Sequence, residues 1–71
     1  MNISFDEQVD ALYIQFQKGK VKKTIKVQDG ILIDIDKEGH LYGIEILDVS
    51  HRIPLKNIGE VNINLPVKVG V

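Results

Sequence analysis

The stretch that decides the fold is residues 31–47, ILIDIDKEGHLYGIEIL. Apolar residues alternate with polar or small ones on both sides of a central break at Lys37–His40. Such a period of two is typical of β-strands, because successive side chains point to opposite faces of a sheet. The stretch therefore predicts two antiparallel strands, Ile31–Asp36 and Leu41–Leu47, with a shared apolar face.

The same alternation extends along the rest of the chain, between breaks that contain Gly or Asp. It predicts three further strands: Asn2–Phe5, Ala11–Phe16 and Val21–Val27. A candidate sixth strand follows at residues 61–65, where Pro66 ends it. Between the fifth and sixth strands the alternation fails, and a turn or short helix is expected. The predicted fold class is mainly β: a five-stranded antiparallel meander with a C-terminal turn or short helix and a possible sixth strand.

The apolar positions also constrain the loops, because directly opposed residues of an antiparallel pair share a face. A three-residue loop, Gln28–Gly30, is preferred over a two-residue turn. It places Val27 opposite Ile31 and Ile25 opposite Ile33, and it puts glycine at the left-handed position. Four-residue loops at 17–20 and 37–40 predict these further pairs: Phe16–Val21, Leu12–Ile25, Ile33–Ile44 and Ile31–Ile46.

One face of the predicted sheet is apolar, and only Lys23 interrupts it. Its members are Ile3, Phe5, Leu12, Ile14, Phe16, Val21, Ile25, Val27, Ile31, Ile33, Ile35, Tyr42, Ile44 and Ile46. Such a face needs a second layer. The C-terminal segment 51–71 is one expected cover, but five large side chains contribute only about 10 kcal/mol before entropy. A second copy of the chain is therefore expected to cover the rest of the apolar face.

Length and composition favour the same conclusion. A chain of 71 residues leaves room for one domain, residues 1–71. Chains below roughly 70–80 residues usually need a disulfide, a metal or a partner subunit. Cysteine is absent and only two histidines are present, so disulfides and a closed zinc site built on these residues alone are excluded. We therefore expect a homodimer, with no cofactor and no metal.

The charge balance and the hydropathy of the chain argue against two classes of binding partner, nucleic acids and membranes. Nine Lys and Arg face ten Asp and Glu, which argues against nucleic acid and anionic membranes. Clustered lysines at residues 18–26 keep nucleic acid as a disfavoured alternative partner. No apolar run approaches the ~20 residues of a membrane span. The N-terminus lacks the pattern of a signal peptide, so the expected location is the cytoplasm.

Three acidic residues, Asp34, Asp36 and Glu45, share the second face of the predicted sheet. Paired carboxylates can bind a hard cation or act as acid and base. The favoured interpretation is ordinary cross-strand charge pairing, with Lys22 opposite Asp36 and Lys26 diagonal to Asp34.

Gly43 is expected opposite Asp34, where its missing side chain leaves a notch in the second face. Tyr13 and several leucines also lie on this face, which makes it mixed enough to contact a partner protein. The candidate binding residues are Tyr13, Asp34, Asp36, Gly43 and Glu45. No catalytic residue is assigned, which favours a role other than catalysis.

The remaining polar residues are interpreted as structural. Asp6 and Asp10 are expected to cap backbone donors in the first turn. Ser50 and His51 are close in sequence to Asp48 but do not make a catalytic triad, because triad partners meet through tertiary folding. Asp48 or Ser50 is instead expected to cap a helix.

The motifs DALYI at residues 10–14 and GIEILD at 43–48, with the Ile33–Asp36 run between them, resemble the domain-of-unknown-function family numbered 2283. Its members are small bacterial and archaeal proteins, and the resemblance spans roughly residues 5–50. Phe5 matches an aromatic position of the family, whereas Val49 replaces a usually small residue. The resemblance implies the extent of the core and supplies no mechanism. Some relatives look like neighbours of toxin-like proteins, which implies an antitoxin-like role as one option.

Two classes of function follow. The leading hypothesis is a small interaction module that self-associates and binds another small protein. The alternative is a ligand- or metal-binding domain, or an enzyme, that uses the acidic residues.

Overall fold

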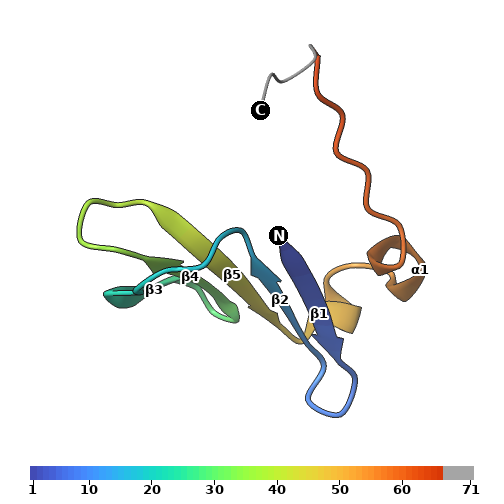
Figure 1. Cartoon of the computed structure of the whole chain (residues 1–71). Coiled ribbons are helices and arrows are strands. Elements are labelled where there is room, and N and C mark those ends of the chain that lie inside the picture. Colours follow the sequence, from blue (N-terminus) through green and yellow to red (C-terminus); the bar gives the residue numbers. More distant parts are fainter. Residues whose placement is uncertain (67–71) are drawn as a thin grey trace.

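The computed structural model describes residues 1–66, which form one open antiparallel sheet followed by a C-terminal segment (Figure 1). The elements are β1 (Asn2–Asp6), β2 (Ala11–Gln15), β3 (Lys23–Gln28), β4 (Ile31–Ile35), β5 (Leu41–Leu47), a 3-10 helix (Val49–His51) and α1 (Leu55–Ile58). The predicted class, mainly β with five antiparallel strands and a C-terminal turn and short helix, is confirmed.

The strand order is β1-β2-β5-β4-β3, so the expected simple meander is wrong in one connection. β2 pairs with β5 and not with β3, and the predicted pairs Phe16–Val21 and Leu12–Ile25 are not formed. The residues that β5 and β3 offer to β2 explain this pairing. β5 offers Ile44 and Ile46 as neighbours for β2, whereas β3 and the connection before it are rich in lysine. An apolar strand suits a central position, and lysines suit an edge.

From Ile31 to Asp34 the β4–β5 register is the predicted one, with Ile33 opposite Ile44 and Ile31 opposite Ile46. After Asp34 the register shifts, and Ile35 lies opposite Leu41 where the predicted four-residue loop would place Tyr42. Ile25 also lies opposite Ile33, as expected.

The β3–β4 loop differs from its prediction. Gln28, not Val27, lies opposite Ile31, and the register shifts between Lys26 and Gln28. A two-residue turn closes the hairpin, with Gly30 in the left-handed conformation at φ 79°. The extra residue in β3 corrects the alternation that this short turn would otherwise reverse.

A row of isoleucines crosses all five strands on one face of the sheet. In spatial order its members are Ile3, Ile14, Ile44, Ile33 and Ile25. A second row runs beside it through Phe5, Leu12, Ile46 and Ile31. We call these two rows together the apolar face. Within residues 1–66 the buried residues are Leu12, Gly43 and Val49, whereas Ile3, Phe5 and Ile25 remain more than a third exposed. Within these residues the apolar face as a whole therefore has no second layer.

Residues 61–65 do not supply that layer. Residues 61–65 lack regular structure, so the candidate sixth strand is wrong for the single chain. A strand forms only beside a partner ladder, and these residues pair with none of the five strands. Leu55, Val61, Ile63 and Leu65 are all more than half exposed. The covering role of 51–71 stays a prediction, and its residues 67–71 lie outside the described part of the chain.

No helix within residues 1–66 combines the length and the apolar character needed to cross a membrane.

Candidate functional site

The second face of the sheet, opposite the apolar face, carries a hydrogen-bonded cluster centred on Asp34. Asp34 lies opposite Gly43, as the sequence predicts. The Tyr13 hydroxyl donates to Asp34 Oδ2 at 2.9 Å, and the Thr24 hydroxyl donates to Asp34 Oδ1 at 2.6 Å. Three strands, β2, β3 and β4, thus contribute side chains to one carboxylate above the glycine of β5. Thr24 was not among the predicted site residues.

Gly43 makes this cluster possible because its missing side chain leaves room for the tyrosine. A Cβ atom at Gly43 would lie 2.7 Å from Tyr13 Cζ, closer than real Cβ atoms approach another atom, and 3.0 Å from the Ile14 carbonyl oxygen. The notch predicted from the sequence is therefore filled by the phenol ring. The hydrogen bond to Asp34 raises the pKa of Tyr13, and burial and the charges of Asp34 and Glu45 add to the effect.

Glu45 and Asp36 take different places. Glu45 lies between Tyr13 and Leu32 in the sheet. Asp36 lies beyond the end of β4 and shares no hydrogen bond with the Asp34 cluster. Of the five predicted binding residues, the structure brings together Tyr13, Asp34 and Gly43, with Glu45 beside them, and separates Asp36.

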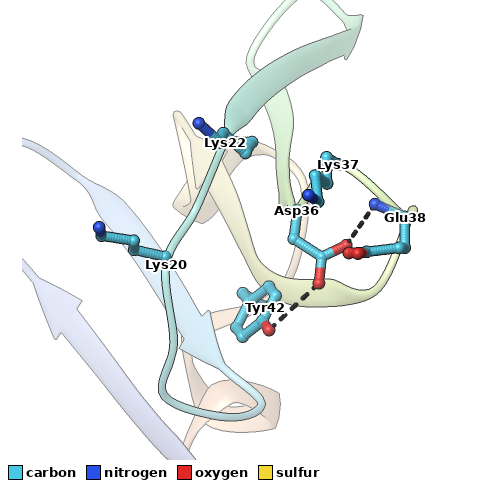
Figure 2. A pocket seen from close by; sticks show the side chains of 6 residues that line it. All are labelled: Lys20, Lys22, Asp36, Lys37, Glu38 and Tyr42. Atoms are coloured by element: carbon cyan, nitrogen blue, oxygen red, sulfur yellow. Dashed lines mark hydrogen bonds between the residues drawn. The ribbon is translucent and has the colours of Figure 1, made fainter.

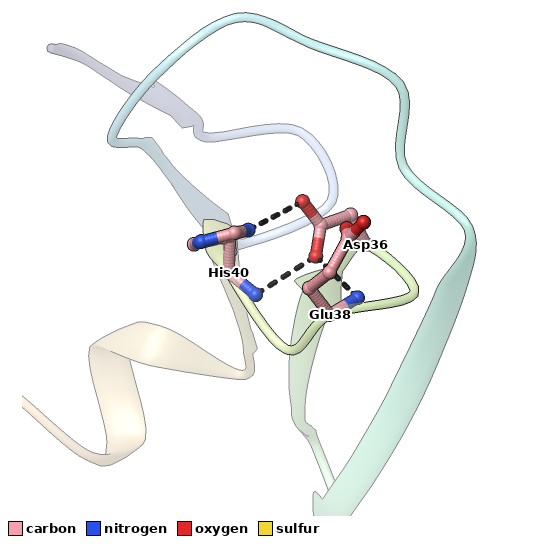
Figure 3. Close-up of side chains that lie close together, drawn as sticks. All are labelled: Asp36, Glu38 and His40. Carbon is pink, nitrogen blue, oxygen red and sulfur yellow. Dashed lines mark hydrogen bonds and ion pairs between the residues drawn. The ribbon is translucent and has the colours of Figure 1, made fainter.

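Asp36 organises the β4–β5 loop (Figure 3). Its Oδ1 accepts the backbone N–H groups of Glu38 and His40, both at 2.9 Å. Its Oδ2 lies 2.9 Å from His40 Nδ1 and accepts the Tyr42 hydroxyl at 3.3 Å. Burial raises the pKa of Asp36, but the hydrogen bonds from His40 and Glu38 outweigh it, and the net pKa lies below its ordinary value. For Tyr42, burial and the Asp36 charge raise the pKa of the phenol.

Asp36, Glu38 and His40 also form the one cluster with metal-ligand potential within residues 1–66, their ligand atoms lying within 4.8 Å of one another. Both Asp36 oxygens already accept hydrogen bonds, and the side chain of His40 is exposed. A cation here would have to displace bonds that hold the loop. The arrangement is that of a loop cap, which uses short polar side chains to satisfy backbone donors.

A shallow pocket of about 350 Å³ lies beside this loop (Figure 2). It is lined by Lys20, Lys22, Asp36, Lys37, Glu38 and Tyr42. Figure 2 shows the Lys20 side chain directed away from the Asp36 carboxylate, so the charges do not converge on one point. The three lysines and Glu38 were not predicted as lining residues. Their meeting depends on the β2–β3 connection crossing the sheet, which local alternation does not reveal.

Asp10, Ser50 and His51 lie close together but lack the geometry of a catalytic triad. The Ser50 hydroxyl donates directly to Asp10 Oδ2 at 2.7 Å. His51 Nδ1 lies 3.5 Å from Ser50 Oγ and 3.7 Å from Asp10 Oδ2, so the same nitrogen faces both partners. A triad instead uses one ring nitrogen for the serine and the other for the carboxylate.

The Asp10 cluster fixes the 3-10 helix to the β1–β2 turn. Asp10 also accepts the Ser50 N–H at 3.1 Å, and its carbonyl accepts the Val49 N–H at 3.1 Å. The expected turn cap is confirmed for Asp6, which accepts the N–H groups of Gln8 and Val9, whereas Asp10 binds across the chain. The expected helix cap is wrong, because the Asp48 side chain makes no cap hydrogen bond and Ser50 binds Asp10.

Arg52 ties the segment after the sheet to the β3–β4 turn. Its Nε donates to the Leu47 carbonyl at 3.0 Å and its Nη2 to the Asp29 carbonyl at 2.6 Å. The clusters described so far are thus satisfied by partners within the chain. The apolar face is the feature that residues 1–66 leave without a partner, and it is the candidate functional surface.

Comparison with known proteins agrees with the motifs at residues 10–14 and 43–48. An uncharacterized protein of Methanocaldococcus jannaschii, MJ0789, is 42% identical over 50 residues, which cover 70% of this chain and 42% of that protein. The chain therefore spans less than half the length of this relative. No solved structure matches the chain. The profile of the family described as "Protein of unknown function (DUF2283)" matches residues 2–50, and the chain belongs to that family.

Proposed function

We propose that the protein is a self-associating interaction module whose apolar face is covered by a second copy of the chain. The observation that carries the proposal is the uncovered row Ile3–Ile14–Ile44–Ile33–Ile25. Small domains reach stability by packing two layers around a core. One chain supplies one layer, and two copies supply both.

The accessible surface of the chain supports this proposal. It is 5809 Å², whereas a folded monomer of 8.0 kDa has about 4,450 Å². The difference is about 1,350 Å², part of which belongs to the extended C-terminal segment. A standard interface removes about 800 Å² from each partner. The total surplus exceeds this area, which is consistent with a surface that is partly covered in a dimer.

Charge does not oppose the association of two copies. The net charge of −1 produces little mutual repulsion. Lys26 and Asp34 lie on the second face, where a sandwich of two apolar faces leaves them in water. Lys23 lies opposite Ile35 on the apolar face, but it stands at the exposed start of the edge strand β3, where its ammonium group can reach solvent at the rim of the sandwich. A second small protein, an antitoxin-like role and the cytoplasmic location stay predictions, and no observation favours another protein over a second copy.

Two lysine substitutions one residue apart test the proposal. Ile33→Lys places a charge on the apolar face, and Leu32→Lys places one on the second face; both positions are half-buried in strand β4. Light scattering coupled to gel filtration is expected to show a monomer for Ile33→Lys and a dimer for Leu32→Lys. Circular dichroism checks that each variant keeps its β-structure.

Ile25→Lys, on the more exposed edge strand β3, serves if Ile33→Lys does not fold. Assembly that survives charges on the apolar face, or that Leu32→Lys abolishes equally, would contradict the proposal.

A further inference from the structure

Within residues 1–66, residues 61–65 pair with no strand, and the outer edge of β1 has no neighbouring strand. We propose that residues 61–65 of one copy add to the free edge of β1 in a second copy, as the sixth strand of that copy's sheet. The proposal rests on the self-association proposed above and names a second contact within it.

The segment Val61-Asn62-Ile63-Asn64-Leu65 has the pattern of a strand with one apolar side. Its apolar residues are 57%, 64% and 63% exposed, although large aliphatic side chains gain about 1.5–3 kcal/mol each from full burial. Pro66 follows at the position where a strand ends, because proline has no N–H to donate.

The two edge strands of the sheet, β3 and β1, differ in the features that discourage the addition of a further strand. β3 carries Lys23 and Lys26 and an irregular register, both of which discourage a further strand. β1 carries no lysine, is exposed throughout, and keeps an unbroken register with β2 over all five of its residues. An edge of this kind is a template for another strand. The β1 edge is therefore the one open to addition.

The side chains of the two elements match. Ile3 and Phe5 of β1 lie on the apolar face, and Ser4 lies on the second face. An antiparallel partner that puts Val61, Ile63 and Leu65 beside Ile3 and Phe5 extends the isoleucine row by one strand. It also puts the two asparagines beside Ser4, where neutral polar groups can exchange hydrogen bonds.

A second copy is the occupant that the single chain points to. Figure 1 shows residues 61–65 leading away from the sheet after α1, and within residues 1–66 no ladder joins them to β1. Reciprocal exchange between two copies satisfies both edges at once and generates the closed two-fold symmetry common in homodimers.

Cysteine cross-linking tests the pairing cleanly, because the chain contains no cysteine. Ser4→Cys protein is mixed with Asn62→Cys or Asn64→Cys protein and oxidised with oxidised glutathione. An antiparallel strand that keeps its apolar residues on the apolar face can place either Asn62 or Asn64 opposite Ser4. A covalent dimer is therefore expected on a non-reducing gel for at least one of the two mixtures. Ile63→Cys is the matched control, since its side chain lies on the other face, and its mixture with Ser4→Cys should lose that band.

The double variants Ser4→Cys/Asn62→Cys and Ser4→Cys/Asn64→Cys distinguish exchange from folding back. An intrachain disulfide in the double variants, without cross-linking in the mixtures, would overturn the exchange. Equal cross-linking with Ile63→Cys, or no cross-linking in any mixture, would also overturn it. If the unmodified chain is nevertheless a dimer that Ile33→Lys dissociates, the interaction module stands and only the strand exchange fails.

Discussion

The two faces of the sheet are built from the same five strands, but they differ in whether their side chains have partners within the chain. On the second face, Tyr13 and Thr24 donate to Asp34 above Gly43, and the polar groups find partners within the chain. On the apolar face, the isoleucine row has a side chain from every strand, and all five side chains stay partly exposed within residues 1–66. The comparison indicates that local hydrogen bonds can complete a polar face, whereas an apolar face needs a second layer.

The largest difference between the faces is expected on truncating their central aliphatic residues. Ile44→Ala is expected to lower the free energy of unfolding by about 3 kcal/mol, because the proposed second copy would bury this side chain fully. Leu32→Ala, on the second face, is expected to cost only about 1 kcal/mol, since the proposed dimer would leave this side chain half-exposed. Urea unfolding at equal protein concentration measures both values. Equal losses would remove the distinction between the faces.

The next largest effect is expected at the glycine beneath Tyr13. Gly43→Ala is expected to cost about 2 kcal/mol, because the new methyl group displaces the Tyr13 ring from Asp34. Gly59→Ala is the matched control, with its nearest contact at 3.8 Å, and it should change stability little. In a double-mutant cycle, Tyr13→Leu combined with Gly43→Ala should lose less than the sum of the single losses. Strict additivity would show that the ring does not occupy the notch.

A smaller effect is expected from removing single hydroxyl groups. Tyr13→Phe is expected to lower the unfolding free energy by about 1 kcal/mol, because Asp34 loses one of its two donors. Tyr42→Phe removes a longer bond, at 3.3 Å, from a carboxylate with three other donors, and should cost less. Thermal unfolding compares the two variants, and a reversed order would contradict this account of the second face.

The smallest effects are expected from pH. The pKa of Tyr13 is raised above its ordinary 10.0, so its contribution to stability is complete below pH 10 and declines as the pH rises through the folded value. The pKa of Asp36 is lowered, so its contribution is complete above the ordinary value of 3.8 and declines as the pH falls through the folded value. Unfolding free energies measured across pH should therefore fall at both ends. Tyr13→Phe should reduce the alkaline fall, to which Tyr42 also contributes because its pKa is raised, and should leave the acid fall intact.

Much of the fold could be predicted from alternation alone. Ile31, Ile33, Ile44 and Ile46 pair as expected, because a one-residue slip would turn each of them to the wrong face. Alternation does not show which strand lies beside which, since Leu12 and Ile14 of β2 match the apolar residues of β3 as well as those of β5. The shift at Val27 was missed for a related reason, as a two-residue turn with an extra strand residue and a longer loop fit the same pattern.

The candidate site was predictable only in part. Gly43 opposite Asp34 follows from the β4–β5 register. The contact of Tyr13 with Asp34 requires β2 to lie beside β5, which no local signal indicates. Val49 is the most buried side chain within residues 1–66, yet it stands alone in an irregular segment, where periodicity carries no information.

Sedimentation velocity of the unmodified chain over a wide range of concentrations tests most directly whether a second copy covers the apolar face. The expected result is a particle of twice the chain mass that dissociates only on dilution, with a melting temperature that rises with protein concentration. A particle of one chain mass at every concentration, unfolding cooperatively at a constant temperature, would contradict it.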